Sequence, residues 1–330
     1  MIARILIAWC VAAAVLFLSP PPGSTADLSL KLGVVTPAQH PHSISAREYA
    51  KLVTERTKGR VEVKVFDNAS LGSNPELLDG VKTGAIDMCV NTPGIMAEYH
   101  PVTGLLELPY LFASKEHRRG VTEGPVGDEI ARTYAEKTGI QIIGYFGGAQ
   151  RNMITRAKAI KSIEDLKSLK MRTWESKVML DWWKALGAVG AVIAFQEVYT
   201  ALQTGVVDGA ENEFTTFMVS RWSEVAKNIA LTQHDITVRP LAISQKSLAK
   251  LPGDLRDILI KAGRDAATYD VKLEGELDEK NMAALKEKYN VVYATPDKKP
   301  FIERSRAVIQ EYAKSKGLEP IAQKIFALAK

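Results

Sequence analysis

VEVKVFDNASLGSNPELLDGVKTGAIDMCV, residues 61–90, contains the pattern that indicates the fold class. Apolar and polar residues alternate strictly over residues 61–66, which predicts a strand. The Asn-Pro-Glu sequence at 74–76 is typical of the N-cap, N1 and N2 positions of a helix, and Gly84 predicts the end of that helix. The apolar run at 86–90 predicts a second strand. This stretch therefore reads strand–helix–strand.

The same rhythm continues on both sides of this stretch. A predicted strand at 28–35 and a predicted helix through 46–53 come before it, so the chain begins β-α-β-α-β. That order predicts an α/β fold with a mainly parallel sheet and helices on both faces. Further strands are predicted at residues 141–145, 169–174, 191–195, 206–211, 236–243 and 291–294. Further helices are predicted after a capping box at 162–165, at 178–186, at 197–204 and within 302–329.

Residues 252–289 differ from the rest of the chain. Apolar side chains recur there at helical spacing, and the stretch is longer than an ordinary domain helix. Two interpretations remain open: one long helix that braces two lobes, or two successive helices with a bend near Gly275. A lobe boundary is expected near Gly147 and Gly148.

The first 26 residues have the features of a secretory signal peptide. Arg4 is followed by an apolar run over 5–18, prolines at 20–22 and small residues up to Ala26. Cleavage after Ala26 predicts a periplasmic protein without direct membrane insertion. The alternative, an uncleaved anchor, requires a longer apolar run than this one.

Composition excludes several classes of function. The net charge of +5 falls to +4 when Arg4 is removed, and charges of both signs are interspersed. Nucleic-acid binders concentrate their positive charge, so no nucleic-acid partner is predicted, whereas a mild positive field favours anionic ligands. Cys10 leaves with the signal peptide, so Cys89 has no partner for an intramolecular disulfide and is expected to be a buried hydrophobe.

Motifs for catalysis are missing from the sequence. It contains no nucleophile elbow, no phosphate-binding loop and no dinucleotide fingerprint. His40 and His42 form the best candidate for a metal pair, but no Cys or Glu-rich partner stands at ligand spacing. We therefore predict no cofactor, no metal and no enzyme activity. Two alternatives remain: a periplasmic enzyme on a two-lobed fold, and a binding protein that feeds a sensor.

Two blocks in the middle of the chain carry a family resemblance. The run IKSIEDLKSLKMR at 160–172 and the run FQEVYTALQTGVVDGAEN at 195–212 resemble segments of the solute-binding proteins of TRAP (tripartite ATP-independent periplasmic) transporters, of the dicarboxylate-binding type. Shorter matches, such as ALGA at 185–188 and LPYLF at 108–112, extend the resemblance over essentially the whole mature chain. Ser168, Ala159 and Asp67 depart from the family pattern, away from the arginine at 172.

The resemblance implies a two-lobed periplasmic binding protein fold with a long helix that spans both lobes. We expect lobe I to contain residues 27–149 and about 238–277, and lobe II residues 150–237 and about 278–330. The implied function is capture of an organic acid between the lobes and its delivery to the membrane permease subunits of a TRAP transporter. Which organic acid is bound stays open at this point.

The resemblance also implies ligand-binding residues. Arg172 matches the arginine that holds the ligand carboxylate, Arg151 matches a second ligand arginine, and Asn212 matches a pocket asparagine. Arg172 also ends a predicted strand, where ligands of open α/β sheets bind, and a guanidinium holds a carboxylate with two parallel hydrogen bonds. The alternatives are a structural salt bridge from Arg172 to Glu211 or Glu175 and a turn capped by Asn212.

Weaker candidates come from positions close to these residues and from loops after strands. Trp174, an uncommon residue at its position, either stacks on a ring-bearing ligand or packs in the core, and it favours a ligand bulkier than a small dicarboxylate. The other candidates are Gln39, Thr92 and Phe214.

Overall fold

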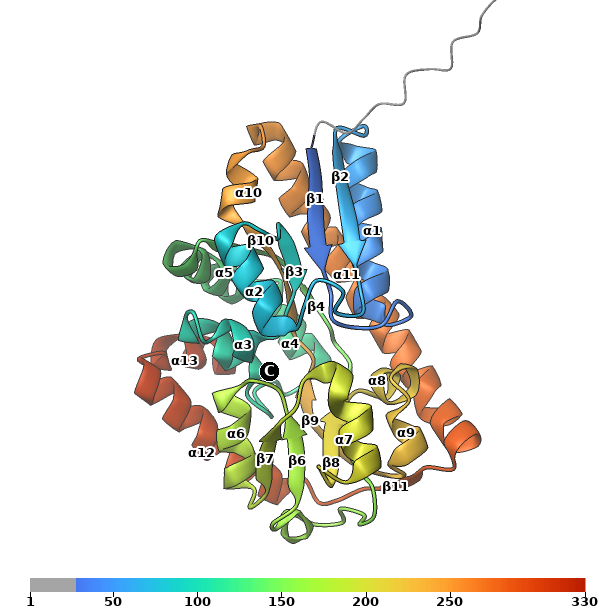
Figure 1. Ribbon diagram of the computed structural model, residues 1–330. Coiled ribbons are helices and arrows are strands. Elements are labelled where there is room, and N and C mark those ends of the chain that lie inside the picture. Colours follow the sequence, from blue (N-terminus) through green and yellow to red (C-terminus); the bar gives the residue numbers. More distant parts are fainter. Residues whose placement is uncertain (1–27, 330) are drawn as a thin grey trace, which may run out of the picture.

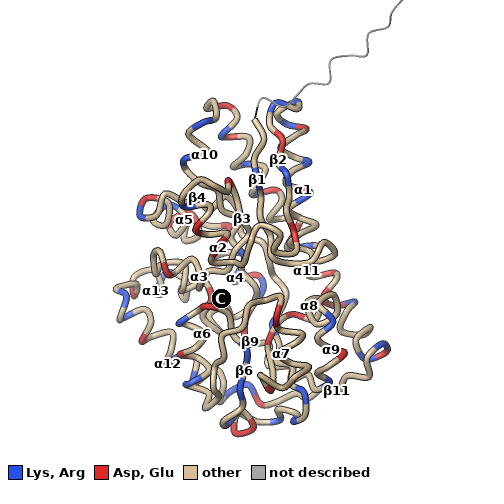
Figure 2. Tube along the Cα trace, in the orientation of Figure 1, with Lys and Arg blue, Asp and Glu red and all other residues tan. Residues whose placement is uncertain are grey.

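The computed structural model describes residues 28–329, so the predicted signal peptide lies outside the described residues. Figure 1 shows two α/β lobes, one above the other, each built on its own sheet. No helix within the described range is long and apolar enough to cross a membrane. Figure 2 shows positively and negatively charged residues interspersed along the backbone of both lobes, as the sequence predicts.

The first sheet has the strand order β2-β1-β3-β10-β4. Strands β1, β2 and β3 are parallel, and β10 pairs antiparallel with both β3 and β4. The parallel part is the predicted β-α-β-α-β unit. The strands are β1 (Leu28–Gly33), β2 (Val61–Phe66), β3 (Met88–Val90), β4 (Ile140–Phe146) and β10 (Arg239–Ser244).

The second sheet has the strand order β11-β9-β5-β8-β6-β7. Strand β5 is antiparallel to both of its neighbours, while the other pairs, β11–β9, β8–β6 and β6–β7, are parallel, so this sheet is mixed but mainly parallel. Its strands are β5 (Gln150–Thr155), β6 (Lys170–Thr173), β7 (Val189–Val192), β8 (Gly209–Asn212), β9 (Asn228–Ile236) and β11 (Val292–Ala294).

Most of the predicted helices form, with shifted ends. Helix α2 has Ser73 as its N-cap, in a capping box with Glu76, one residue before the predicted N-cap. The capping box at Ser162 and Asp165 is present and starts a short 3-10 helix. The helices predicted from sequence are α1 (Pro41–Arg56), α2 (Asn74–Thr83), η2 (Ile163–Leu166), α6 (Lys177–Ala185), α7 (Val198–Thr204), α12 (Lys299–Lys316) and α13 (Glu319–Ala327).

Eight helices of the described residues were not predicted, and four of them lie between β3 and β4. They are α3 (Pro93–Met96), η1 (Pro101–Glu107), α4 (Lys115–Thr122), α5 (Pro125–Thr138), η3 (Phe195–Glu197), α8 (Phe214–Val219), α9 (Trp222–Val225) and α10 (Gln245–Ala249). The strand predicted at 236–243 is also wrong. It is the end of β9 and most of β10, which belong to different sheets and are separated by only two residues.

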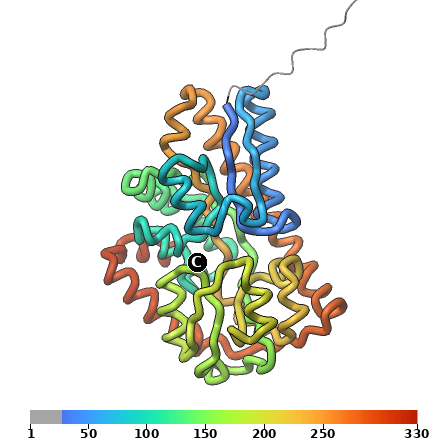
Figure 3. The backbone as a smooth tube through the Cα atoms, in the orientation of Figure 1, coloured from blue at the N-terminus to red at the C-terminus, as the bar shows by residue number. Residues whose placement is uncertain are grey.

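Helix α11 (Gly253–Tyr289) is one continuous helix of 37 residues, so the alternative of two helices bent near Gly275 does not apply. It packs against α1 and β4 beside the first sheet and against α8 beside the second. Figure 3 shows it, in orange, descending from the upper to the lower lobe. Gly144 and Gly263 permit this close approach, because a Cβ on Gly144 would lie 2.5 Å from the Gly263 carbonyl oxygen.

The chain crosses between the sheets at 147–149 and again at 237–238, and these two crossings are bonded to each other. The Thr237 N–H donates to the Ala149 carbonyl over 2.9 Å. Two carboxylates of α11 hold the first crossing: Asp270 accepts from the Gly147 N–H over 2.6 Å, and Glu274 accepts from the Ala149 N–H over 2.8 Å. We call this bonded set, Gly147–Ala149 with Thr237, Asp270 and Glu274, the crossing clamp.

Gly147 is the position in the crossing clamp where a side chain should be least tolerated. Its φ is +102°, and a Cβ there would lie 2.3 Å from the Thr237 carbonyl oxygen. We expect Gly147→Ala to destabilise the protein by about 1–3 kcal/mol, because backbone strain and the clash act together. Urea unfolding measures this change.

Gly275→Ala is the matched control. Gly275 lies within α11 and has open space around its Cβ position, so alanine there should stabilise the helix by up to about 1 kcal/mol. Equal effects of the two substitutions would contradict the role of the crossing clamp.

Candidate functional site

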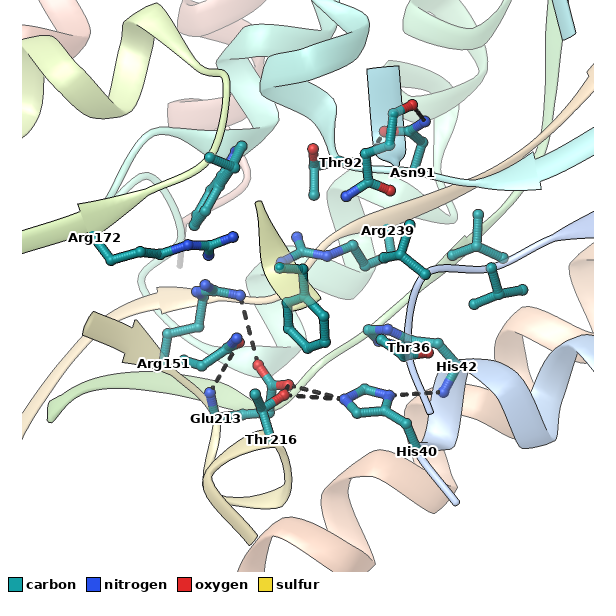
Figure 4. A pocket seen from close by; sticks show the side chains of 17 residues that line it. Thr36, His40, His42, Asn91, Thr92, Arg151, Arg172, Glu213, Thr216 and Arg239 are labelled. Atoms are coloured by element: carbon teal, nitrogen blue, oxygen red, sulfur yellow. Dashed lines mark hydrogen bonds and ion pairs between the residues drawn. The ribbon is translucent and has the colours of Figure 1, made fainter. Parts of the chain in front are cut away.

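A cavity lies between the two sheets, and side chains from both lobes line it (Figure 4). The first lobe contributes Thr36, His40, His42, Asn91, Thr92 and Arg239. The second lobe contributes Arg151, Arg172, Trp174, Asn212, Glu213 and Thr216. Of the predicted site residues, the structure therefore brings together Arg151, Arg172, Asn212, Trp174 and Thr92.

Two predicted residues lie elsewhere. Gln39 is exposed, because the turn that precedes α1 directs His40 inward and leaves Gln39 on the outside. Phe214 packs edge-on against Phe217 and Tyr293 in the core of the second lobe. Neither residue belongs to the cavity lining.

Arg151 forms an ion pair inside the protein, although its Nη1, 3.5 Å from the Glu213 carboxylate, has no hydrogen-bond partner among the described residues. Its Nε and Nη2 donate to the two carboxylate oxygens of Glu211 over 2.6 and 2.7 Å. His234 contacts the same carboxylate over 3.0 Å, and the His234 ring stacks on Trp182. Burial opposes ionisation of Glu211, but Arg151 and His234 outweigh it and lower the pKa of Glu211 to about 2. The charge of Arg151 is therefore neutralised on the side away from the cavity.

Arg172 has no such partner. It lies on β6, is 3% exposed, and its Nε donates to the carbonyl oxygen of Ile193 over 3.0 Å. Among the described residues, no carboxylate oxygen lies within 4.0 Å of its guanidinium, since Glu211 pairs with Arg151. The alternative of a structural salt bridge to Glu211 or Glu175 is thus not observed. Burial lowers the pKa of Arg172 to about 10, and the side chain stays charged at neutral pH.

Trp174 forms the wall beside these cations. Its side chain is buried, and the guanidinium carbons of Arg151 and Arg172 lie 5.0 and 5.5 Å from its ring centroid. The sequence left open whether Trp174 contacts a ligand or packs in the core; in the structure it packs in the core and also lines the cavity.

Asn212 forms the turn cap considered from sequence and also lines the cavity. Its Oδ1 accepts a hydrogen bond from the Glu213 N–H over 3.2 Å, which is the predicted turn cap. The side chain lines the cavity at the end of β8, and among the described residues none accepts a hydrogen bond from its NH₂ group. Asn212 therefore adds an unused donor to the residues that line the cavity.

Two buried histidines close the end of the cavity near the crossing clamp. His40 contacts Glu213 and Thr216, both over 3.1 Å, and His42 contacts Glu274 over 3.1 Å. Burial lowers the pKa of both histidines. Ligand atoms of His42, Asp270 and Glu274 lie within 4.8 Å of one another, but both carboxylates already accept from the crossing backbone.

The sequence analysis missed Arg239 and Glu213 as lining residues. Arg239 is a lone cation in the apolar run VRPLAIS, and a charge in an apolar strand was the signal that could have identified it. Glu213 directly follows the predicted Asn212, and its pairing with His40 joins segments 173 residues apart. No local pattern reveals such a contact.

The buried acids predict how stability depends on pH. Burial raises the pKa of Glu107 and of Asp278, each to about 8. Such groups bind protons more tightly when folded, so their effect stabilises the native state as pH falls through about 8 toward 4. The lowered pKa values of His40 and His42 act in the opposite direction only below about pH 6.5.

We therefore expect the free energy of unfolding to rise as pH falls from about 8.5 to about 6.5. Asp278→Asn should weaken this dependence, since asparagine keeps an acceptor for the Thr215 N–H but does not titrate. Urea unfolding at constant ionic strength measures the slope, with the exposed Asp257→Asn as control. A slope that Asp278→Asn leaves unchanged would show that this carboxyl group does not contribute.

Comparisons with known proteins agree with the two-lobed architecture. Residues 32–316 match the family described as bacterial extracellular solute-binding protein, family 7. The 2,3-diketo-L-gulonate-binding periplasmic protein of Escherichia coli is 30% identical over 278 residues, covering 84% of each chain.

Solved structures are similar over nearly the whole chain. A TRAP periplasmic solute-binding protein from Sulfitobacter sp. NAS-14.1 with bound β-D-galacturonate has a TM-score of 0.85 at 28% identity, covering 91% of this chain and 99% of its own. One from Chromohalobacter salexigens with bound D-glucuronate has a TM-score of 0.86 at 27% identity, with the same coverage.

Proposed function

Because the chain belongs to family 7 of the bacterial extracellular solute-binding proteins, the solute-binding proteins of TRAP transporters, we propose that its ligand is a six-carbon sugar acid. The observation that carries this proposal is the buried guanidinium of Arg172, which lines a polar cavity and has no carboxylate partner in the described chain. A desolvated charge without a counter-ion is unfavourable, and a ligand carboxylate supplies that counter-ion.

Arg172 binds the carboxylate of the ligand, and the NH₂ group of Asn212 donates to the same end. The paired Arg151 acts as a support: Glu211 fixes its position and it adds positive potential behind Arg172. Each charge-assisted hydrogen bond contributes about 1.5–3 kcal/mol.

Polar groups without partners favour a ligand with hydroxyl groups. Asn74 Oδ1, Thr92 Oγ1 and Trp174 Nε1 are buried and have no hydrogen-bond partner among the described residues. All three residues line the cavity. Hydroxyl groups both donate and accept, so the hydroxyls of a sugar acid match two acceptors and a donor. The face of Trp174 suits a sugar ring or extended polyol better than a small flat diacid.

The lobes follow the two sheets. We propose lobe I as residues 27–149 with about 238–277 and lobe II as residues 150–237 with about 278–330. The C-terminal helices contact both lobes: α12 packs against α6 of lobe II, and α13 packs against α5 of lobe I. Ligand binding closes the lobes about the crossing clamp.

The protein works as the periplasmic component of a transporter. The first 26 residues direct export and are removed after Ala26, and the closed, loaded form docks on TRAP membrane permease subunits. It releases the acid chemically unchanged, which distinguishes a binding protein from an enzyme.

Isothermal titration of mature protein (residues 27–330) with D-galacturonate, D-glucuronate, succinate and D-galactose tests this proposal. We expect the two sugar acids to bind, and D-galactose to bind at least about 100-fold more weakly, because it lacks the carboxylate. The acid recovered after incubation should be unaltered by mass and by NMR. Tight binding of succinate alone would overturn the choice of a sugar acid.

Arg172→Ala should weaken sugar-acid binding at least about 100-fold, and Arg172→Lys should weaken it less, because lysine keeps the charge but not the planar fork. Arg221→Ala is a matched control, since Arg221 is exposed and pairs with Glu224 on the surface. Undiminished binding by Arg172→Ala would show that another residue holds the carboxylate.

A further inference from the structure

Arg239 is a second cation of the cavity without a carboxylate partner, and it comes from the first sheet. It is the first residue of β10, is half-buried, and its Nη1 donates to the carbonyl oxygen of Val238 over 2.8 Å. No carboxylate oxygen of the described chain lies within 4.0 Å of this guanidinium. Its remaining N–H groups are therefore available to the cavity.

Arg239 and Arg172 face the same space from opposite lobes. Figure 4 shows the side chains of Arg172 and Arg239 pointing toward each other in the cavity. Their Cζ atoms lie 6.0 and 5.5 Å from the centroid of that ring, so their separation cannot exceed the sum of the two distances. Burial and then the charge of Arg151 lower the pKa of Arg239, because like charges are held close together.

The acids around Arg239 do not remove this excess of charge. Glu213 is already bonded to His40 and Thr216. Glu107, whose pKa burial raises to about 8, is mostly protonated at neutral pH. Asp235 is a further acid near Arg239, and burial raises its pKa to about 6. Among the described residues, none of these carboxylates forms a salt bridge with Arg172 or Arg239.

We propose that Arg239 is a specificity-determining residue that binds, from the first lobe, the same ligand carboxylate that Arg172 binds from the second. This inference rests on the proposed function and adds a mechanism to it. A ligand shifts an open–closed equilibrium only through its different affinity for the two states. The contact with Arg239 requires closed lobes, so the carboxylate itself drives closure, and a neutral sugar lacks this effect.

The first test compares Arg239→Gln and Arg239→Lys with wild type by titration with D-galacturonate. We expect Arg239→Gln to weaken binding about 10- to 100-fold and Arg239→Lys to weaken it less. The weak binding of D-galactose should not change. Arg256→Gln is the matched control, because exposed Arg256 also donates to a backbone carbonyl, that of Leu251 over 2.8 Å.

The melting temperature of ligand-free Arg239→Gln shows whether Arg239 serves to bind the ligand or to stabilise the fold. Removing one of two like charges should leave the melting temperature of Arg239→Gln equal to that of wild type or raise it. A residue retained for packing or for pairing with Asp235 would instead lower the melting temperature when replaced.

Closure is measured with spin labels at Glu98→Cys and Asp181→Cys. Both residues are exposed and line one groove between the lobes, whereas the native Cys89 is buried and stays unlabelled. At saturating D-galacturonate, the pair should shift to the short distance in wild type and only partly in Arg239→Gln.

The possible failures are distinguishable. A wild type that binds no sugar acid overturns the proposed function and this inference with it. Normal binding and closure by Arg239→Gln overturn only the role of Arg239, and so does weaker binding accompanied by a lower melting temperature of the ligand-free variant.

Discussion

The unpaired charge of Arg172 is the constraint on which the cavity depends. A guanidinium cannot lose its proton at neutral pH, and burial without a counter-ion is unfavourable, so the surroundings must stabilise it from a distance. The neighbouring pair of Arg151 and Glu211 is nearly neutral and is fixed by His234. Because that carboxylate is fully used by Arg151, Arg172 is left for an anion from outside. Because Arg151 pairs with Glu211, the guanidinium of Arg172 stays available to an anion.

Much of the fold could be predicted from the sequence, for reasons that particular elements make clear. The alternation at residues 61–66 and the helix after it are local patterns, and they correspond to β2 and α2 within a residue or two. The passage from β9 to β10 could not be found in the same way. Only Thr237 and Val238 separate the two strands, and neither is a Gly or Pro that would indicate a turn. Their separation into different sheets depends on long-range pairing, with β5 for one and β3 for the other.

The site was predictable only where a motif or a strand end marked it. Arg172 and Asn212 were identified because the family resemblance placed them, and both do line the cavity. The prediction that Gln39 lines the site was wrong, because the direction of a side chain in a turn depends on backbone angles that the sequence does not specify. Arg239 was missed because a single arginine in an apolar strand belongs to no motif. Its place in the cavity is evident only once the two sheets are seen to face each other.

The crossing clamp and the cations together explain how a small anion can control the arrangement of two lobes. Helix α11 and the bonded crossings fix the lobes at one edge, because Asp270 and Glu274 hold the backbone where it passes between the sheets. Away from that edge the lobes share a hydrophobic cluster, and the cavity between them holds the unpaired cations Arg172 and Arg239, whose repulsion opposes closer approach. An anion between them reverses the sign of that interaction. Under the proposed function, the free energy of closure therefore depends on the charge of the ligand, and a neutral ligand of similar size would not supply it.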